Sequence, residues 1–543
     1  MKKLLFLSCS IMLVILWSNY TYSLPKPGED ELQRKPVNVR DLQKNTISSI
    51  DFYNTNYGII GHNAATTRGG LFWPRGTSNQ YLFASGFWFG AQKMKPDKSE
   101  MYKYVTISYN PNSGISWLVP GIIREEQDNV DASKLYMHRI YYSTDFNEAT
   151  GQAYDKSDGP AWPLWKNSDT QQLCEYSEND FEYDTNSRNT NRYPLGHLVI
   201  SDEDMFCTYK DTDLSSYEGG ALARRALGYP LRLQVYQRVL TWNSDHTLKD
   251  CAIVQYLLTN ESQDTLKNCY FAPLYDIDIG LTSEQAKNDR LRYYDYDKSL
   301  NLAVGWTNTN LGELGSGYGY IGVSLIETPA IDDEGYIKKG LSYYPSDQQL
   351  GISTFKNWPI EEDRALDNER YDFISSHIID GDTGPGDKRL MFSTGPFHLL
   401  PKETIRVAVL IAFAMPCKGG EADGTTEDIS CVNGLEGKAK RAISYYYSPK
   451  TSVDENANPI INLAIHPNPA SEYIEISSPF INPTVNRGVD ESSEIKIFNT
   501  LGECVISVET RHAVSLQRID ISHLPRGVYY LRIGNRTQMF VKM

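Results

Sequence analysis

The sequence predicts a mainly β protein, with an antiparallel β-sandwich body of one or two domains and one short helix, followed by a small Ig-like β-sandwich. Aromatic residues make up 12% of the 543 positions, led by 37 Tyr, and such side chains fit the half-buried surface of a sheet. Short apolar runs alternate with turn sequences, which favours antiparallel strands. The length also exceeds what a single core usually serves.

The first residues are typical of a secretory signal peptide. A basic start precedes an almost unbroken apolar run from Leu4 to Trp17, and Ser23 offers a small residue for cleavage. We therefore assign 1–23 as a signal peptide and the polar, Pro-containing stretch 24–49 as a leader or linker. The apolar run is too short to span a membrane comfortably, and no later stretch reaches that length, so the mature chain is predicted to lack a transmembrane segment.

The body is expected to cover 50–447, with a candidate division near 230–245, where regular strands resume. Its first strands flank a turn-rich middle between Gly70 and Gly90, and the run around Trp88 is apolar enough for a strand buried on both faces. The apolar run 251–259 passes through a turn sequence into 266–278, which predicts a hairpin. Further strands are predicted at 102–109, 231–242, 301–306, 318–326, 389–392 and 404–414.

One helix is predicted from Leu435 to Tyr447. Apolar residues recur at helical spacing on one face, with Lys438 among the cations off that face, and Pro449 ends the pattern. A linker rich in Pro, Asn and Asp is expected at 448–462.

Export to an oxidising compartment would allow disulfide bonds. Cys251 and Cys269 bracket the predicted hairpin, and Cys417 and Cys431 bracket an acidic, Gly-rich loop. These two pairs are our candidate disulfides, although spacing alone does not decide the pairing.

Two acidic groups are candidate Ca²⁺ ligands, because Ca²⁺ takes six to eight oxygen ligands. The first has Asp276 and Asp278 at a strand end, with Asp295 and Asp297 repeating the spacing nearby. The second is the Gly-rich stretch 380–387. A strand end holds ligands more firmly than a loop, so we favour the first group. The alternative is that both are ordinary Asp-containing turns.

No catalytic residue is assigned. The sequence contains neither H-E-x-x-H nor G-x-S-x-G, which removes the usual zincin and α/β-hydrolase signatures. Two carboxylates distant in sequence could still form a glycosidase pair. The net charge of −15 and the lack of a basic, aromatic-rich patch argue against a nucleic-acid partner.

The stretch from about 125 to 193 is predicted to form long loops, where binding function often lies. Within it, Trp162 and Trp165 form an isolated aromatic island. We regard this pair as the candidate glycan-binding residues.

The end of the chain, 463–543, resembles the type A C-terminal sorting domain of the type IX secretion system. Matching phrases occur in order: 467–470, 473–476, 495–503 and 519–533, with Lys542 near the terminus. The candidate sorting-motif residues are Pro467, Asn468, Pro469, Gly502, Gly527, Tyr529 and Lys542.

The resemblance implies a route. It implies a Gram-negative producer, transfer across the inner membrane by the signal peptide, and recognition of the tail by the type IX translocon at the outer membrane. A sorting protease usually removes such tails, and surface lipopolysaccharide is then a frequent attachment partner. We therefore expect an extracellular or outer-membrane surface location.

The body resembles only uncharacterised β-rich cargo proteins of that system, through phrases at 87–90 and 393–397. No activity transfers with this resemblance. Our leading hypothesis is a non-enzymatic surface protein in adhesion, matrix or envelope structure. The alternative is a carbohydrate-active enzyme or a glycan-binding protein built on the same sheets.

Overall fold

The structure is a computed structural model of the 543-residue chain. It describes residues 40–121, 123, 139–147, 153–154, 200–217, 219–280, 282–307, 318–338, 344–447, 464–466, 469–477, 494–499, 503–509, 516–533 and 536–543. The predicted signal peptide (1–23) and linker (448–462) lie outside these residues. The described residues up to Tyr447 form one compact unit and those from Ala464 form a second.

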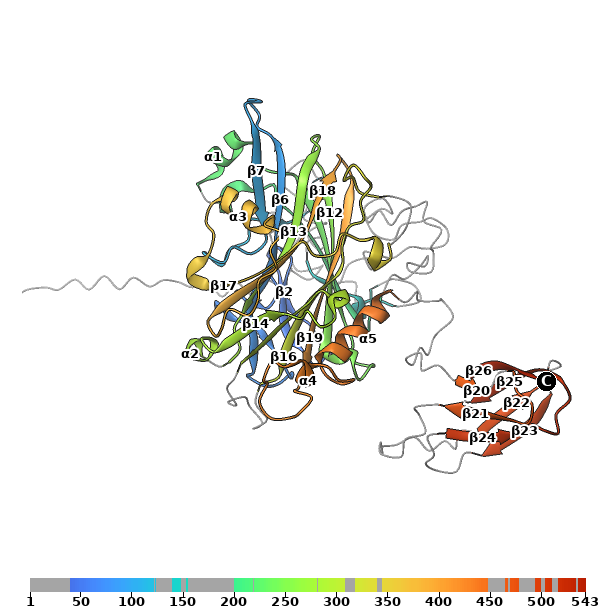
Figure 1. The fold of residues 1–543 in the computed structure, drawn as a ribbon. Coiled ribbons are helices and arrows are strands. Elements are labelled where there is room, and N and C mark those ends of the chain that lie inside the picture. Colours follow the sequence, from blue (N-terminus) through green and yellow to red (C-terminus); the bar gives the residue numbers. More distant parts are fainter. Residues whose placement is uncertain are drawn as a thin grey trace, which may run out of the picture. The chain divides into compact units, whose positions relative to one another are not determined.

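An antiparallel eight-stranded sheet forms the first layer of the body (Figure 1). Its order is β1-β2-β5-β6-β13-β18-β17, with β7 paired to β6. The strands are β1 (Leu42–Lys44), β2 (Asp51–Thr55), β5 (Leu71–Phe72), β6 (Gln80–Met94), β7 (Met101–Ile107), β13 (Leu266–Ile277), β17 (Thr354–Pro359) and β18 (Lys388–Leu399).

A nine-stranded antiparallel sheet forms the second layer, in the order β14-β15-β16-β19-β12-β11-β10-β8, with β9 paired to β10. Its strands are β8 (Val119–Pro120), β9 (Tyr141–Tyr142), β10 (Glu203–Lys210), β11 (Leu233–Thr241), β12 (Cys251–Asn260), β14 (Asp289–Tyr293), β15 (Leu302–Thr307), β16 (Tyr320–Glu327) and β19 (Thr404–Ala414). A small ribbon of β3 (His62–Asn63) and β4 (Arg68–Gly69) completes the body.

The main core lies between the two sheets. One hydrophobic cluster joins residues such as Phe87 and Phe271 of the first sheet to Tyr256 and Phe413 of the second. Phe87 and Tyr256 meet edge to face, with ring centroids 5.4 Å apart. The predicted β-sandwich body is therefore observed, and large aromatic side chains fill the space between its layers.

Helix α5 (Leu435–Tyr447) covers the outer face of the nine-stranded sheet, within the bounds predicted from the sequence. Its apolar face joins a second hydrophobic cluster with β12, β16 and β19. Lys438, which we expected off that face, is buried, and its Nζ lies 2.6 Å from Asp250 Oδ2. Burial on both faces explains why strands such as β12 are continuous apolar runs.

Four shorter helices accompany α5 in the described part of the body. Helix α3 packs on the outer face of β6 and β7. The shorter helices are α1 (Ala221–Leu227), α2 (Ser283–Ala286), α3 (Asp367–Ile374) and α4 (Thr426–Ile429).

The predicted hairpin of 251–259 with 266–278 is wrong. Both segments are strands, but β12 pairs with β11 and β19, whereas β13 pairs with β6 and β18. The chain crosses from one sheet to the other at Asn260, whose side-chain amide donates to the carbonyl oxygens of Asp264 and Leu399. Local sequence shows the turn but does not decide whether the second strand returns to the same sheet.

Two predicted boundaries differ from what the structure shows. Strand β1 lies inside the stretch predicted as leader or linker and pairs with β2. Asp41 beside it is buried, and its carboxylate accepts from the backbone N–H of Ile140. Strand β11 lies between β10 and β12, so both sides of the candidate division near 230–245 share one sheet.

The second unit contains two antiparallel sheets with their own hydrophobic cluster. A three-stranded sheet has the order β20-β21-β24, and a four-stranded sheet has the order β23-β22-β25-β26. The strands are β20 (Ala464–His466), β21 (Tyr473–Ser477), β22 (Glu494–Phe498), β23 (Cys504–Glu509), β24 (Leu516–Asp520), β25 (Gly527–Ile533) and β26 (Arg536–Lys542). Inward residues Ile474 and Ile497 are fully buried, as a small two-layer β unit requires.

Candidate functional site

The strongest candidate site is a group of four aspartates where β13, β14 and β18 meet, which we call the carboxylate cluster: Asp276, Asp278, Asp289 and Asp387. Asp276 lies opposite Arg389, one register step before the last β13–β18 pair. Asp278 and Asp387 follow directly after that pair, and Asp289 is the first residue of β14. The structure thus brings together two residues of the first acidic group singled out in the sequence, Asp276 and Asp278, and one residue of the second, Asp387.

Asp276 is held inside the sheet by two donors. Its Oδ2 accepts from the Tyr109 hydroxyl at 2.9 Å and from Arg389 Nη2 at 3.2 Å. Burial raises the pKa of Asp276 to about 7, although the Arg389 charge and the Tyr109 hydrogen bond act in the opposite direction. The side chain is 8% exposed, so it contacts protein donors and is closed to a large ligand.

Asp278 and Asp387 are half-buried and repel each other. Gln80 Nε2 donates to Asp278 Oδ2 at 2.7 Å. Burial, together with the charge of Asp387, raises the pKa of Asp278 to about 6, and the Gln80 bond lowers it. Burial also raises the pKa of Asp387, against the lowering effect of Arg389. Two carboxylates placed this way favour retention of a proton.

Asp289 completes the cluster. One of its oxygens accepts from the backbone N–H of Ile279 at 2.8 Å, and the other is buried without a hydrogen-bond partner in the described structure. Burial raises the pKa of Asp289 well above its usual value, and the charges of Asp278 and Asp387 act in the same direction. A protonated carboxyl is the form that this environment favours.

Burial therefore raises the pKa of every member of the carboxylate cluster. The described residues include no group of three or more His, Cys, Asp or Glu side chains placed to hold a metal ion. Asp276 instead forms an ion pair with Arg389, a residue 113 positions away. The proposed Ca²⁺ set of Asp276, Asp278, Asp295 and Asp297 is not assembled as a coordination sphere.

The other predicted acidic ligands have local structural partners. Asp297 accepts from the backbone N–H of Ser299 and pairs with Lys440 at 3.0 Å, while Asp295 is exposed and 3.9 Å from Arg292. In the 380–387 stretch, Asp382 Oδ1 accepts from the Gly384 N–H at 2.8 Å. The bonds of Asp297 to the Ser299 N–H and of Asp382 to the Gly384 N–H are the side-chain-to-backbone bonds of ordinary Asp turns, which was the alternative for both groups.

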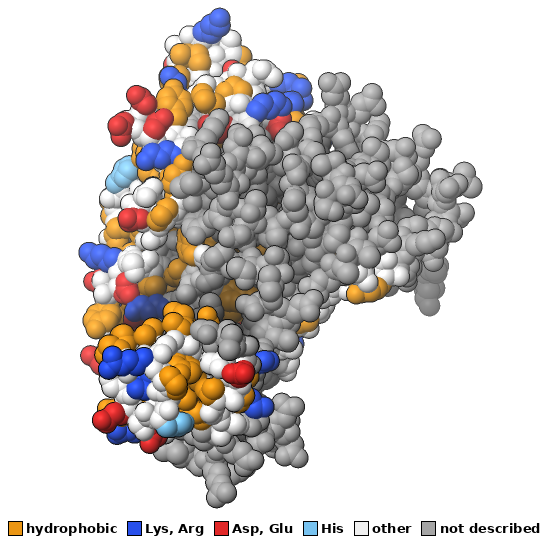
Figure 2. All heavy atoms as spheres, turned by 90° about the vertical axis from the view of Figure 1, so that its right-hand side faces the viewer, with side chains coloured by type: hydrophobic (Ala, Val, Ile, Leu, Met, Phe, Trp, Pro, Cys, Tyr) orange, Lys and Arg blue, Asp and Glu red, His pale blue; other side chains and the backbone are white. Residues whose placement is uncertain are grey.

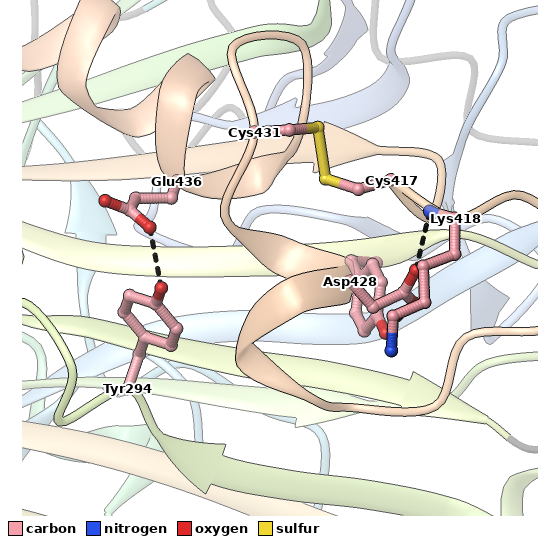
Figure 3. Close-up of a disulfide and its surroundings, with 7 residues drawn as sticks. Tyr294, Cys417, Lys418, Asp428, Cys431 and Glu436 are labelled. Carbon is pink, nitrogen blue, oxygen red and sulfur yellow. Dashed lines mark hydrogen bonds between the residues drawn. A yellow bond between two sulfur atoms is a disulfide. The ribbon is translucent and has the colours of Figure 1, made fainter.

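The structure contains one of the two candidate disulfides. Cys417 and Cys431 are bonded, and they close a loop that runs through α4 (Figure 3). In the same view, Asp428 accepts from the Lys418 backbone N–H at 3.0 Å, and Glu436 accepts from the Tyr294 hydroxyl at 2.6 Å. The loop is thus fastened to itself, and α5 is fastened to the segment that follows β14.

The other candidate pair is not formed. Cys251 and Cys269 are both free and buried. Cys251 lies opposite Ala412 in the nine-stranded sheet, and Cys269 lies opposite Phe397 in the eight-stranded sheet. The reason is the crossover at Asn260, which places the two strands in different layers. The predicted pairing depended on the hairpin.

The glycan-binding candidates Trp162 and Trp165 lie outside the described residues. On the face shown in Figure 2, the described surface mixes cationic, anionic and hydrophobic side chains. None of the described helices is long and apolar enough to cross a membrane.

The described sorting-motif residues come together in the second unit. Gly527 begins β25 opposite Lys542 on β26. Tyr529 is buried against Phe540, and its hydroxyl donates to the Pro525 carbonyl at 2.8 Å. Pro469 lies in an exposed bend next to Ala470. Pro467, Asn468 and Gly502 lie outside the described residues.

Comparison with known proteins agrees with this geometry. Residues 464–543 match the family model described as the secretion system C-terminal sorting domain, of the Por secretion system. The tail is therefore a secretion sorting domain. The protein is a cargo of the type IX, or Por, secretion system, which implies recognition by that system and secretion to the cell surface or the medium.

Other comparisons add little. A search of the curated proteins found no match. A solved polysaccharide lyase aligns at 9% identity over 57% of this chain and 34% of the lyase, with a TM-score of 0.18. The chain thus spans about a third of that protein, and a likeness this low carries no argument about fold or activity.

Proposed function

We propose that the protein is a non-enzymatic component of the cell surface, acting in adhesion, matrix or envelope structure. The sorting domain at 464–543 supports export of the protein by the type IX secretion system. The signal peptide proposed for 1–23 supplies the first step of that route, and attachment to surface lipopolysaccharide is the proposed final step.

The observation that carries the proposal is the way in which the body uses its buried charges. Asp276, a candidate catalytic acid, already accepts hydrogen bonds from Arg389 and Tyr109. Other buried charges are also paired across elements, as in Lys438 with Asp250 and Arg406 with Glu327. Buried ion pairs of this kind join neighbouring strands, or a helix to its sheet, which is compatible with a scaffold.

An enzyme of the carbohydrate-active class would need two carboxylates flanking an accessible substrate bond. Asp278 is half-buried and its pKa is raised to about 6, so it is the first residue to test for that alternative. A glycan-binding role would instead involve Trp162 and Trp165.

The test has two arms. In cells, a chain lacking 463–543 should remain in the periplasm, and a strain without the protein should lose adherence or matrix mass. In vitro, the purified full chain should bind matrix material but release no reducing ends from a polysaccharide panel over many hours.

Each result decides something different. Normal surface display without the tail would contradict the sorting role. Multiple-turnover release of reducing ends, lost in Asp278→Asn, would replace the scaffold function with an enzymatic one. Glycan binding lost on Trp162→Ala with Trp165→Ala, without turnover, would establish the glycan-binding alternative.

A further inference from the structure

The four-stranded sheet of the sorting domain has an unusual outer face. Its inward positions are buried, as in Ile495, Ile497 and Leu531. The alternating outward positions of a sheet that faces water are normally polar. Here several of them are apolar, including Phe498 on β22 and Tyr530 on β25.

These outward residues form a continuous row across all four strands, which we call the outer row: Cys504, Phe498, Tyr530 and Met539. The register places Cys504 opposite Phe498, Phe498 opposite Tyr530, and Tyr530 opposite Met539. Tyr530 is 39% exposed and Met539 is 48% exposed. Side chains opposite each other on one face of a sheet are neighbours, so the row is one apolar strip.

Cations lie beside this strip. Lys496 and Arg532 are opposite each other, two residues along β22 and β25 from the outer row. Lys496 alternates with the buried Ile495 and Ile497, and Arg532 follows the buried Leu531, so both lie on the outward face.

The other sheet of the domain provides an internal comparison. Its outward positions are Tyr473 and Glu475 on β21 and Arg518 and Asp520 on β24, with Ile474 and Ile519 buried between them. Arg518 lies over the Tyr473 ring, 3.3 Å from its centroid. This face has the polar composition expected in water. Within the described residues, the apolar excess belongs to the four-stranded sheet.

We propose that the outer row is the surface by which the type IX machinery recognises this tail, through an apolar groove on the recognising protein. An exposed apolar strip is costly in water and marks interaction surfaces. Recognition by the secretion machinery is what the family match implies for this domain. The proposal rests on the sorting role and adds which face performs it.

Backbone hydrogen bonds and a buried aromatic stack support the strands that carry the strip. The Ala470 N–H donates to the Val541 carbonyl, and the Met543 N–H donates to the Ala470 carbonyl, each at 2.8 Å. These bonds fasten the end of β26 to the start of the domain. The buried stack of Tyr529 on Phe540 supports β25 and β26 from below.

The experiment uses full-length chains produced in cells that carry the secretion system. The double variant Tyr530→Ser with Met539→Ser keeps the inward core and should accumulate in the periplasm, with surface and medium protein reduced at least tenfold. The matched control, Arg518→Ser with Asp520→Ser on the other face, should be secreted as the parent is. An apolar-conserving variant, Tyr530→Phe with Met539→Leu, should also be secreted normally.

Folding is checked by circular dichroism and protease resistance of each purified chain. If the serine variant is folded and secreted normally while a chain lacking 464–543 stays in the periplasm, the outer row is not the recognition surface but the sorting role stands. If the truncated chain is secreted too, the sorting role itself fails. The proposal would also be overturned if the conservative variant remains in the periplasm. It would be overturned too if size-exclusion chromatography shows that the outer row serves only to form a dimer.

Discussion

Arg389 and Asp276 lie opposite each other on β18 and β13 and form a buried ion pair, with Nη2 and Oδ2 3.2 Å apart. The same guanidinium group places Nη1 2.6 Å from Asp363 Oδ2, and all three side chains are 8% exposed or less. One cation therefore neutralises two carboxylates from different parts of the chain. This arrangement fastens β13, β18 and the segment after β17 at one end of the sheet.

Replacing Arg389 with Met should strongly destabilise the body, because two buried carboxylates lose their counter-charge. Removal of one partner from a buried pair typically costs about 3–5 kcal/mol. Urea unfolding of the full chain, followed by tryptophan fluorescence, measures the change. A change below about 1 kcal/mol would contradict the role assigned to Arg389.

The matched control is Lys287→Gln, which removes one partner of the exposed Lys287–Glu284 pair. Exposed pairs contribute little to stability. The midpoint of unfolding should stay where it is in the parent.

Replacing Asp278 with Asn should change how stability depends on pH. The folded-state pKa of Asp278 is raised to about 6, whereas an unfolded Asp titrates near ~3.9. The folded chain therefore binds the proton more tightly, and the stabilisation present below about pH 4 is lost as pH rises through about 6. The Asn variant lacks this loss, so relative to the parent it should gain on the order of 2 kcal/mol between about pH 4 and 7.

The measurement is urea unfolding of both chains at several pH values. Asp295→Asn, at an exposed carboxylate on the neighbouring turn, serves as the control and should follow the parent curve. If the stability of the parent and of Asp278→Asn depends on pH in the same way, Asp278 has the same pKa in the folded and unfolded states, and the prediction is wrong.

Loss of the Cys417–Cys431 bond should destabilise the body without changing its fold. A bond that closes a loop with a sequence separation of 14 contributes about 3 kcal/mol in the chain-entropy treatment. The double variant Cys417→Ser with Cys431→Ser should show this loss in urea unfolding. Peptide mapping without reductant should find the two cysteines linked in the parent, with Cys251 and Cys269 available for alkylation after denaturation.

Removal of Val541–Met543 should destabilise the sorting domain alone. The truncation deletes both backbone bonds to Ala470 and the end of β26. Because the described residues form two compact units with separate cores, calorimetry of the full chain should show the tail transition at a lower temperature and the body transition unchanged. A shift of the body transition would mean that the units are coupled.

Several features could be predicted because they depend on local patterns. Helix α5 follows from apolar residues at helical spacing between Leu435 and Tyr447. Strand β22 follows from the alternation of Ile495 and Ile497, which are buried in the structure. The sorting domain at 464–543 was identified from ordered phrases in the sequence and matches the family model.

The candidate site could be predicted only in part. Asp276 and Asp278 stood out because two acids at a strand end are conspicuous in a sequence. Their partners did not stand out, since Asp387 and Arg389 are more than a hundred positions away and no local signal links them. The Cys251–Cys269 pairing failed for a related reason, because it assumed which sheet β13 would join.

Side-chain patterns were enough to predict the β class of this protein, its helix at 435–447 and its sorting tail. These depend on side-chain periodicity and turn chemistry, which act over a few residues. Which strands pair and which charges meet depends on contacts between distant parts of the chain. Whether the chain after Asn260 returns to its own sheet or crosses to the other depends on the packing of both layers. That choice placed Asp276 opposite Arg389 and left Cys251 and Cys269 apart.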